Sequence, residues 1–217
     1  MKDKKLIKSG YTNPKRVSFP IDEKLHEWLP ALLNAYYIID KGISEALKEE
    51  FKKGRKLACA KGCSYCCKTH ETIPVYPLEL VGLSWYATEK IKGHNRDILK
   101  KQLKQYKSGD PCPFLIDGIC SIHSVRPISC RQFNVFGKPC KEGEDPYYTR
   151  REDVLKPIKK YIDHAFFIML PFYGIKDENE RIRVIETGGV HTIVKLLQSL
   201  NWKSLAEKME EYDSEMA

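Results

Sequence analysis

The spacing of apolar side chains predicts helices on both sides of a central region that lacks periodicity. Leucine, tyrosine and isoleucine recur at helical spacing within residues 22–53, and Gly54 can end that helix. Similar patterns predict helices over 77–91, 96–106, 153–170, 190–200 and 202–212. Pro77 suits a first turn, whereas Pro30 and Pro157 predict breaks or kinks. Only residues 181–186 favour a strand, so the pattern predicts a mainly α fold.

The central region, residues 108–146, combines glycine, proline and four cysteines with little periodicity. Such a segment forms irregular structure and needs stabilisation from outside the segment. We therefore expect an irregular, loop-rich cysteine core held between helices. The predicted organisation is a basic N-terminal arm (1–20), a metal-binding cysteine-cluster domain (21–150) and a C-terminal helical region (151–217) packed on it.

Composition bears on the compartment in which these cysteines work. With 217 residues and 42% hydrophobic content, the chain can bury a real core, so cysteines are not needed to rescue a small scaffold. No secretory signal is recognisable, and the longest apolar stretch (165–172) is far shorter than the roughly 20 residues that span a bilayer. We expect a cytoplasmic protein without a membrane segment. Clustered cysteines in that compartment are more often metal ligands or catalytic groups than disulfides.

The formal net charge of +8 has two explanations. A solvated, lysine-rich surface is favoured, and binding of a nucleic acid or another polyanion stays open without being favoured. Metal-bound thiolates would also add negative charge that the formal count omits. The sequence does not identify the partner, and we expect an unknown protein partner or substrate.

The eight cysteines carry the strongest chemical signal. They form two groups: Cys59, Cys63, Cys66 and Cys67, then Cys112, Cys120, Cys130 and Cys140. Gly62 allows a tight turn in the first group, and the two helices between the groups can fold as a hairpin that brings them together. A divalent metal takes about four ligands and an iron–sulfur cluster commonly takes four thiolates. All eight cysteines are therefore candidate ligands of zinc or iron, with a [4Fe-4S] cluster as one form, in one site or two.

The second group lies in the sequence CPFLIDGICSIHSVRPISCR, which begins at Cys112 and ends at Arg131. Together with the first group, it resembles the CxxCxxCC, or YkgJ-like, family of zinc- or iron-chelating proteins, over roughly residues 59–140. Cys140 matches only a subset of that family and is the least secure ligand. The resemblance implies metal binding and no particular reaction. A flagellin lysine N-methylase is similar in its cysteine region, which keeps protein methylation open.

Several neighbours of the cysteines have weaker claims. His123 could be a further ligand, but packing near the site is favoured. His70 could also ligate, although a solvated loop histidine is the favoured interpretation. Arg126 and Arg131 bracket Cys130, where they could donate hydrogen bonds to sulfur and offset its negative charge.

Three other functions compete with simple metal chelation. The spacing of Cys59, Cys63 and Cys66 resembles that of radical S-adenosylmethionine enzymes, in which three cysteines hold a [4Fe-4S] cluster. Those enzymes use a βα barrel, whereas here a long helix precedes the motif. Electron transfer and a structural zinc module for a polyanionic partner are the other two. No catalytic residue is identified, and the sequence leaves open whether the protein is an enzyme.

Overall fold

The computed structural model describes residues 13–216 and is mainly α, as the sequence predicts. In chain order, the longer helices are α3 (Trp28–Lys52), α5 (Pro77–Glu89), α6 (Gly93–Gln105), α9 (Lys159–Met169), α10 (Glu178–Glu186) and α11 (Lys203–Glu215). Short helices are α2 (Asp22–Leu25), α4 (Tyr65–Thr69), α7 (Ile128–Gln132) and α8 (Pro146–Thr149), with 3-10 turns η1 (His123–Val125), η2 (Arg151–Asp153), η3 (Leu170–Tyr173), η4 (Gly189–Ile193) and η5 (Leu197–Ser199). The strands are β1 (Pro74–Val75), β2 (Leu115–Ile116), β3 (Ile119–Cys120) and β4 (Lys195–Leu196).

Helix α3 supplies one wall of the core. Leu29, Leu33, Ile39 and Leu47 share one buried face at helical spacing. The helix ends where Gly54 takes a left-handed φ of +81°, which confirms the predicted stop. The break predicted at Pro30 is misplaced. The helix is interrupted between α2 and α3, and Pro30 lies in the first turn of α3. A proline in the first turn removes a backbone N–H that has no intrahelical partner there.

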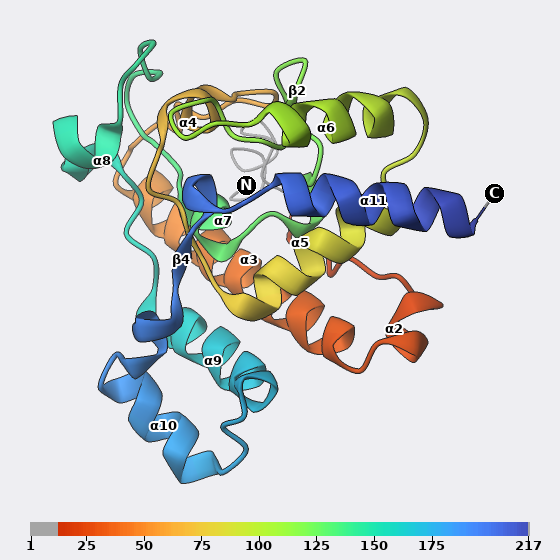
Figure 1. The fold of residues 1–217 in the computed structure, drawn as a ribbon. Helices are drawn as coiled ribbons and strands as arrows, with labels where there is room; N and C mark the ends of the chain where they lie inside the picture. The colour runs from red at the N-terminus through yellow and green to blue at the C-terminus, as the bar shows by residue number, and fades with distance from the viewer. Residues whose placement is uncertain (1–12, 217) are drawn as a thin grey trace.

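The other helices pack around α3 in two groups (Figure 1). Helices α5, α7 and α9 contact α3 directly, and α10 packs on α9. Helix α11 lies against α5 and α6. The loops that carry the cysteines lie between these groups and share their core, since Phe114, Ile122 and Phe136 are fully buried in it.

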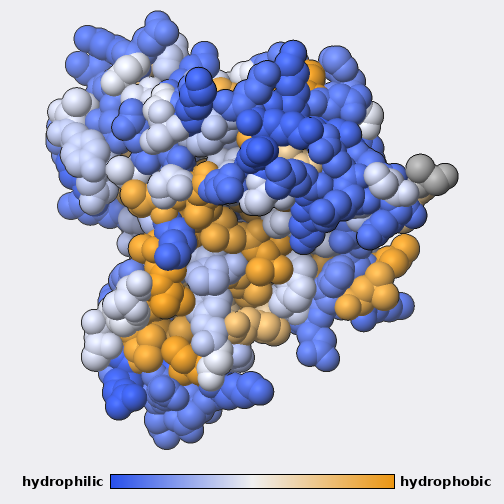
Figure 2. Space-filling model, in the orientation of Figure 1, coloured by the Kyte–Doolittle hydropathy of each residue, from blue (hydrophilic) through white to orange (hydrophobic). Residues whose placement is uncertain are grey.

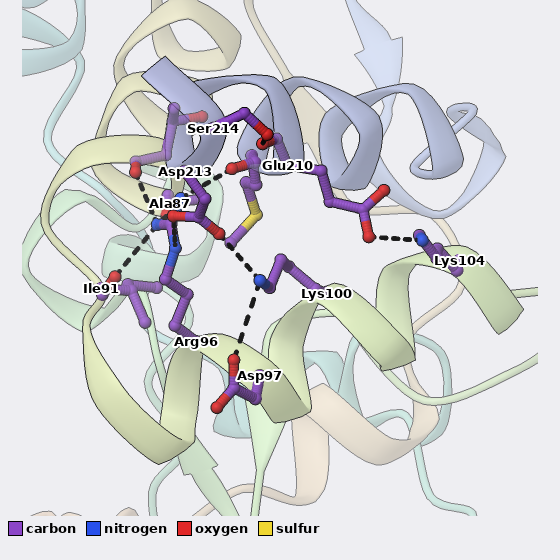
Figure 3. Close-up of polar contacts among 11 residues, drawn as sticks. Ala87, Ile91, Arg96, Asp97, Lys100, Lys104, Glu210, Asp213 and Ser214 are labelled. Atoms are coloured by element: carbon purple, nitrogen blue, oxygen red, sulfur yellow. Dashed lines mark hydrogen bonds and ion pairs between the residues drawn. The ribbon is translucent and has the colours of Figure 1, made fainter. Parts of the chain in front are cut away.

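A buried arginine ties α5, α6 and α11 together (Figure 3). Arg96 is 5% exposed, and its Nη1 donates to the carbonyl oxygens of Ala87 and Thr88 at 3.2 and 2.6 Å. Its Nη2 donates to the carbonyl of Met209 at 3.0 Å, and its Nε pairs with Asp213 at 2.8 Å. The guanidinium thus satisfies carbonyls at the C-terminal end of α5, which have no partner within the helix.

Two small antiparallel sheets join distant segments. Strands β1 and β4 pair with Pro74 opposite Leu196, which fixes the chain before α5 to the segment before α11. Strands β2 and β3 form a hairpin whose two turn residues, Asp117 and Gly118, have φ of +50° and +76°. Positive φ at both positions is the geometry of a type I′ turn, which Asp-Gly favours.

Three extended segments also run side by side near the first cysteine. Residues 56–58 lie beside 134–137, with Ala58 N–H donating to the carbonyl of Val135 at 2.7 Å. Residues 153–155 lie on the other side of 134–137, with Leu155 N–H donating to the carbonyl of Asn134 at 2.8 Å. This pairing explains why the helix predicted to begin at 153 begins only at Lys159. The backbone of residues 153–155 already forms hydrogen bonds with the neighbouring extended segment.

Two further predictions were wrong. Residues predicted as a strand at 181–186 belong to helix α10, whose first turn is capped by the Asp177 side chain accepting from Glu180 N–H at 2.8 Å. The helix predicted over 190–200 is instead η4, β4 and η5, because this segment pairs with β1. The described part of the predicted N-terminal arm, from residue 13, is partly ordered by Arg16, which pairs with Glu23 at 2.7 Å.

One face of the protein carries a band of apolar surface (Figure 2). It lies between α11 and the part formed by α9 and α10, and large apolar side chains of the elements nearby are exposed, among them Val81, Ile182 and Leu196. This band interrupts the hydrophilic surface on that face. Among the described residues, no helix combines the length and apolar character needed to cross a membrane.

Candidate metal centre

The first cysteine group lies on a tight loop that leads into helix α4. Gly62 has a φ of +84°, a conformation that side-chain-bearing residues rarely adopt, and the N–H of Cys63 donates to the carbonyl of Ala60 at 3.0 Å. Cys66 and Cys67 follow within α4. The tight turn expected at Gly62 is confirmed, and it reverses the chain immediately before three of the four cysteines.

The second group comes from four different local structures. Cys112 lies in a loop, Cys120 on strand β3, Cys130 in helix α7, and Cys140 in a loop that follows Gly137. The hairpin turn after β2 therefore determines where Cys120 lies. Helix α7 does the same for Cys130.

Backbone contacts bring the two groups together. The N–H of Cys112 donates to the carbonyl of Cys67 at 2.7 Å. At the other side of the site, the N–H of Val135 donates to the Sγ atom of Cys59 at 3.3 Å. The structure thus places the groups beside each other, as the sequence analysis expected.

Cys66 is central to the arrangement of thiols. It contacts the thiol of Cys67, which in turn contacts that of Cys112. The thiols that Cys66 influences electrostatically belong to Cys59, Cys67, Cys120, Cys130 and Cys140. Cys63, the one exposed cysteine, lies near Cys59 and Cys140. All eight cysteines are free thiols. We call them the cysteine cluster; Cys112 is buried, whereas Cys63 is exposed on its more open side.

Burial and mutual repulsion keep most of these thiols protonated. Burial raises the pKa of Cys59 to about 11, and a hydrogen bond with Cys112 is the main cause that raises the pKa of Cys67 to about 12. Burial, followed by the charge of Cys66, raises the pKa of Cys130 well above its ordinary value. Several thiolates this close together need a nearby positive charge, which a bound cation would supply.

The donor chemistry fits zinc or iron, although the side-chain directions do not yet form a coordination shell. Thiolates are the ligands that structural zinc and iron–sulfur clusters prefer. Within residues 13–216, no three Cys, His, Asp or Glu side chains already surround a common point in the way metal ligands do.

Two arginines lie next to the buried side of the cluster. The positive charges of Arg126 and Arg131 both favour the thiolate form of Cys120, although burial still leaves the pKa of that thiol raised. Arg131 is held in place by Asp40 at 2.8 Å and by the carbonyl of Ser124 at 2.6 Å. The expected proximity of both arginines to the cysteines is therefore found.

The histidines behave differently from expectation in one case. His70 was expected in solvent, but its side chain is 10% exposed, with Nε2 3.3 Å from a carboxylate oxygen of Asp145 and its ring packed edge-on against Phe133. The His70 side chain is covered by contacts that the sequence spacing does not reveal. His123 contacts Arg126, and burial followed by that charge lowers the pKa of His123 to about 4.

Fold and site together define a mainly helical protein with a cluster of thiols gathered between its helices. Residues 58–154 match the CxxCxxCC family, described as "Putative zinc- or iron-chelating domain". The match confirms the family that the cysteine spacing resembles, and it supports metal binding by this part of the chain. No curated protein and no solved structure significantly matches the chain.

The fold also bears on the resemblance to radical S-adenosylmethionine enzymes. Those enzymes place their three cysteines beside a βα barrel, which needs a closed parallel sheet. The sheets formed by the described residues are two-stranded and antiparallel. The C-x3-C-x2-C spacing is therefore found here on a different, helical framework.

Proposed function

We propose that the protein binds zinc or iron through its clustered cysteines, and that iron is held as an iron–sulfur cluster, [4Fe-4S] being the form that four thiolates commonly support. The observation that carries this proposal is the position of Cys66. It lies among cysteines of both groups, so sulfur donors that are far apart in the sequence are available to one site.

The surroundings of the thiols support the same function. A bound metal would supply positive charge that stabilises the thiolates. The protein contributes the charges of Arg126 and Arg131 beside Cys120, and the burial that keeps water away from Cys130. Because these thiols are protonated at neutral pH without a cation, binding should release protons and strengthen as pH rises. A reducing compartment such as the cytoplasm would keep all eight thiols available.

The proposal is tested by elemental and acid-labile sulfide analysis of protein purified without oxygen, together with its absorption spectrum. Zinc, or iron with sulfide, in amounts that scale with protein concentration supports metal binding. Iron with sulfide specifically supports the iron–sulfur form, and zinc alone supports a structural or Lewis-acid site. Protein that contains neither metal, and that gains neither when reconstituted under reducing conditions, would contradict the proposal.

A further inference from the structure

Glu79 is a fully buried carboxylate at the start of α5, and it serves two helices. Its Oε2 atom accepts a hydrogen bond from the N–H of Tyr76 at 3.0 Å, at the N-terminus of α5. Its Oε1 atom accepts from the N–H of Ile128 at 2.7 Å, and Ile128 is the first residue of α7. A carboxylate at a helix N-terminus satisfies a free N–H and interacts favourably with the helix dipole.

Helix α7 depends on such contacts because it has only five residues. Helices this short are not stable by themselves in water, so tertiary contacts fix their position. Two contacts do so here: Glu79 binds the first N–H of α7, and Asp40 of α3 binds Arg131 at 2.8 Å. Cys130 lies between these two attachment points, in the middle of the helix.

Glu79 itself is a poor candidate for a metal ligand. Both carboxylate oxygens already accept backbone hydrogen bonds, and the side chain is 0% exposed. Arg131 lies near it, together with the phenol groups of Tyr36 and Tyr173. The carboxylate therefore reaches the cysteine cluster through the backbone of α7 rather than through its own oxygens.

We propose that Glu79 is a positioning residue of the metal centre: by binding the N-terminus of α7, it holds Cys130 in place beside Cys66 and Cys67. This inference rests on the proposed function, because it assigns Glu79 to the same metal site. It links the metal site to α5, and it predicts that a residue with no sulfur or free donor atom controls metal affinity.

The test compares Glu79→Gln with Asp213→Asn. Both changes replace a carboxylate by an amide of the same shape, and both carboxylates belong to hydrogen-bond networks at an end of α5. Asp213 lies at the opposite end, where it pairs with Arg96 and Lys100, each at 2.8 Å. The glutamine can accept at only one of the two positions, so one backbone N–H loses its partner. Both variants should lower thermal stability, and only Glu79→Gln should alter the metal site.

Three measurements on each protein separate these roles: the affinity for Co²⁺ used as a probe metal, the sulfur-to-cobalt charge-transfer absorption, and alkylation of Cys130 in metal-free protein followed by mass spectrometry. For Glu79→Gln we expect an affinity about 10- to 100-fold weaker, reduced charge-transfer absorption and faster alkylation of Cys130. Asp213→Asn should resemble the wild type in all three. Equal behaviour of the two variants would overturn the proposal for Glu79.

The same experiment distinguishes failure of the inference from failure of the proposed function. Wild-type protein that binds no metal at all contradicts the proposed function. The alkylation rate of Cys130 still decides the role of Glu79 in that case, because it reports on the position of α7 without any metal. If Cys130 is alkylated equally fast in the wild type and in Glu79→Gln, then Glu79 does not position it.

Discussion

Single cysteines differ in how firmly local structure holds them. Cys66 lies in helix α4 and Cys130 in helix α7, whereas Cys140 lies in a loop that follows Gly137. We predict that alanine at Cys63, Cys66, Cys120 or Cys130 removes bound metal, and that Cys140→Ala keeps most of it. The measurement is metal per chain in variants purified identically without oxygen. Equal loss in Cys140→Ala and Cys63→Ala would make Cys140 a full ligand and the ranking wrong.

A second prediction at the residue scale concerns Glu23, away from the cysteines. Arg16 donates to its carboxylate at 2.7 Å, and the N–H of Phe19 donates at 2.8 Å. The hydrogen bond from Arg16 is the main cause that lowers the pKa of Glu23 to about 2. A depressed pKa stabilises the folded state above the ordinary carboxyl pKa, and this stabilisation is lost as pH falls from about 4.5 towards about 2.

We therefore expect Glu23→Gln to lower the free energy of unfolding by about 1 kcal/mol at pH 7, a value that allows for solvent screening. The difference from wild type should shrink as pH falls below 4.5. Urea unfolding at several pH values measures it, with Glu27→Gln, a change at an exposed neighbour, as the control. A difference that stays constant across this pH range would show that the carboxylate charge is not responsible.

At the scale of elements, the sequence predicted what local patterns determine. Helix α5 was predicted because proline begins it and apolar residues repeat along it, and α11 was predicted for the second of these reasons. The hairpin of β2 and β3 was missed, although Asp117-Gly118 between apolar residues is a recognised signal for it. Errors at 153–158 and 190–200 have another cause, since residues 153–155 pair with the segment 134–137 and β4 pairs with β1.

In the candidate site, too, local patterns predict some features, whereas contacts between separate segments could not be predicted. The eight cysteines and the nearby arginines could be identified from spacing alone, because metal ligands and charges need particular residue types. Glu79 could be identified only as a helix-capping residue, three positions after the N-cap of α5. Its contact with Ile128 spans 49 residues of the chain. No local pattern could predict that contact, nor the burial of His70 against Asp145.

The missed hairpin gives a prediction for this element. Gly118 has a φ of +76°, and a Cβ atom there would be no closer than 4.0 Å to its nearest neighbour, the Ser64 hydroxyl. Gly118→Ala should therefore cost stability through backbone strain alone, about 1–2 kcal/mol. Gly189→Ala is the matched control, because Gly189 lacks a positive φ and its added Cβ would meet Val184 at an ordinary 3.5 Å. Urea unfolding that finds equal costs would contradict the turn geometry.

At the scale of the whole molecule, the cysteine loops share the hydrophobic core of the helices that surround them. Residues 134–137 lie between the segment before the first cysteine group and the segment that leads into α9. Apolar anchors such as Phe114 and Phe136 hold the intervening chain in the core. Metal loss should thus loosen the loops near Cys63 and Cys140 more than these anchored residues.

We predict that a chelator, or the change Cys63→Ala, lowers the melting temperature and exposes the cysteine loops to protease. Calorimetry and mass spectrometry of the cleavage products measure the two effects. Lys61→Ala, a change at an exposed residue of the same loop, is the control and should behave as wild type. Unchanged melting and unchanged protection after verified metal loss would show that the fold does not depend on the metal.

The central claim is that cysteines from both groups bind one metal site, and X-ray absorption spectroscopy of anaerobically purified protein tests it most directly. The predicted result is a metal whose nearest neighbours are mainly sulfur, at about 2.3 Å. Variants with alanine at Cys66 in the first group, or at Cys130 in the second, should each lose sulfur neighbours. A metal surrounded only by oxygen and nitrogen, or unaffected by either change, would contradict the account.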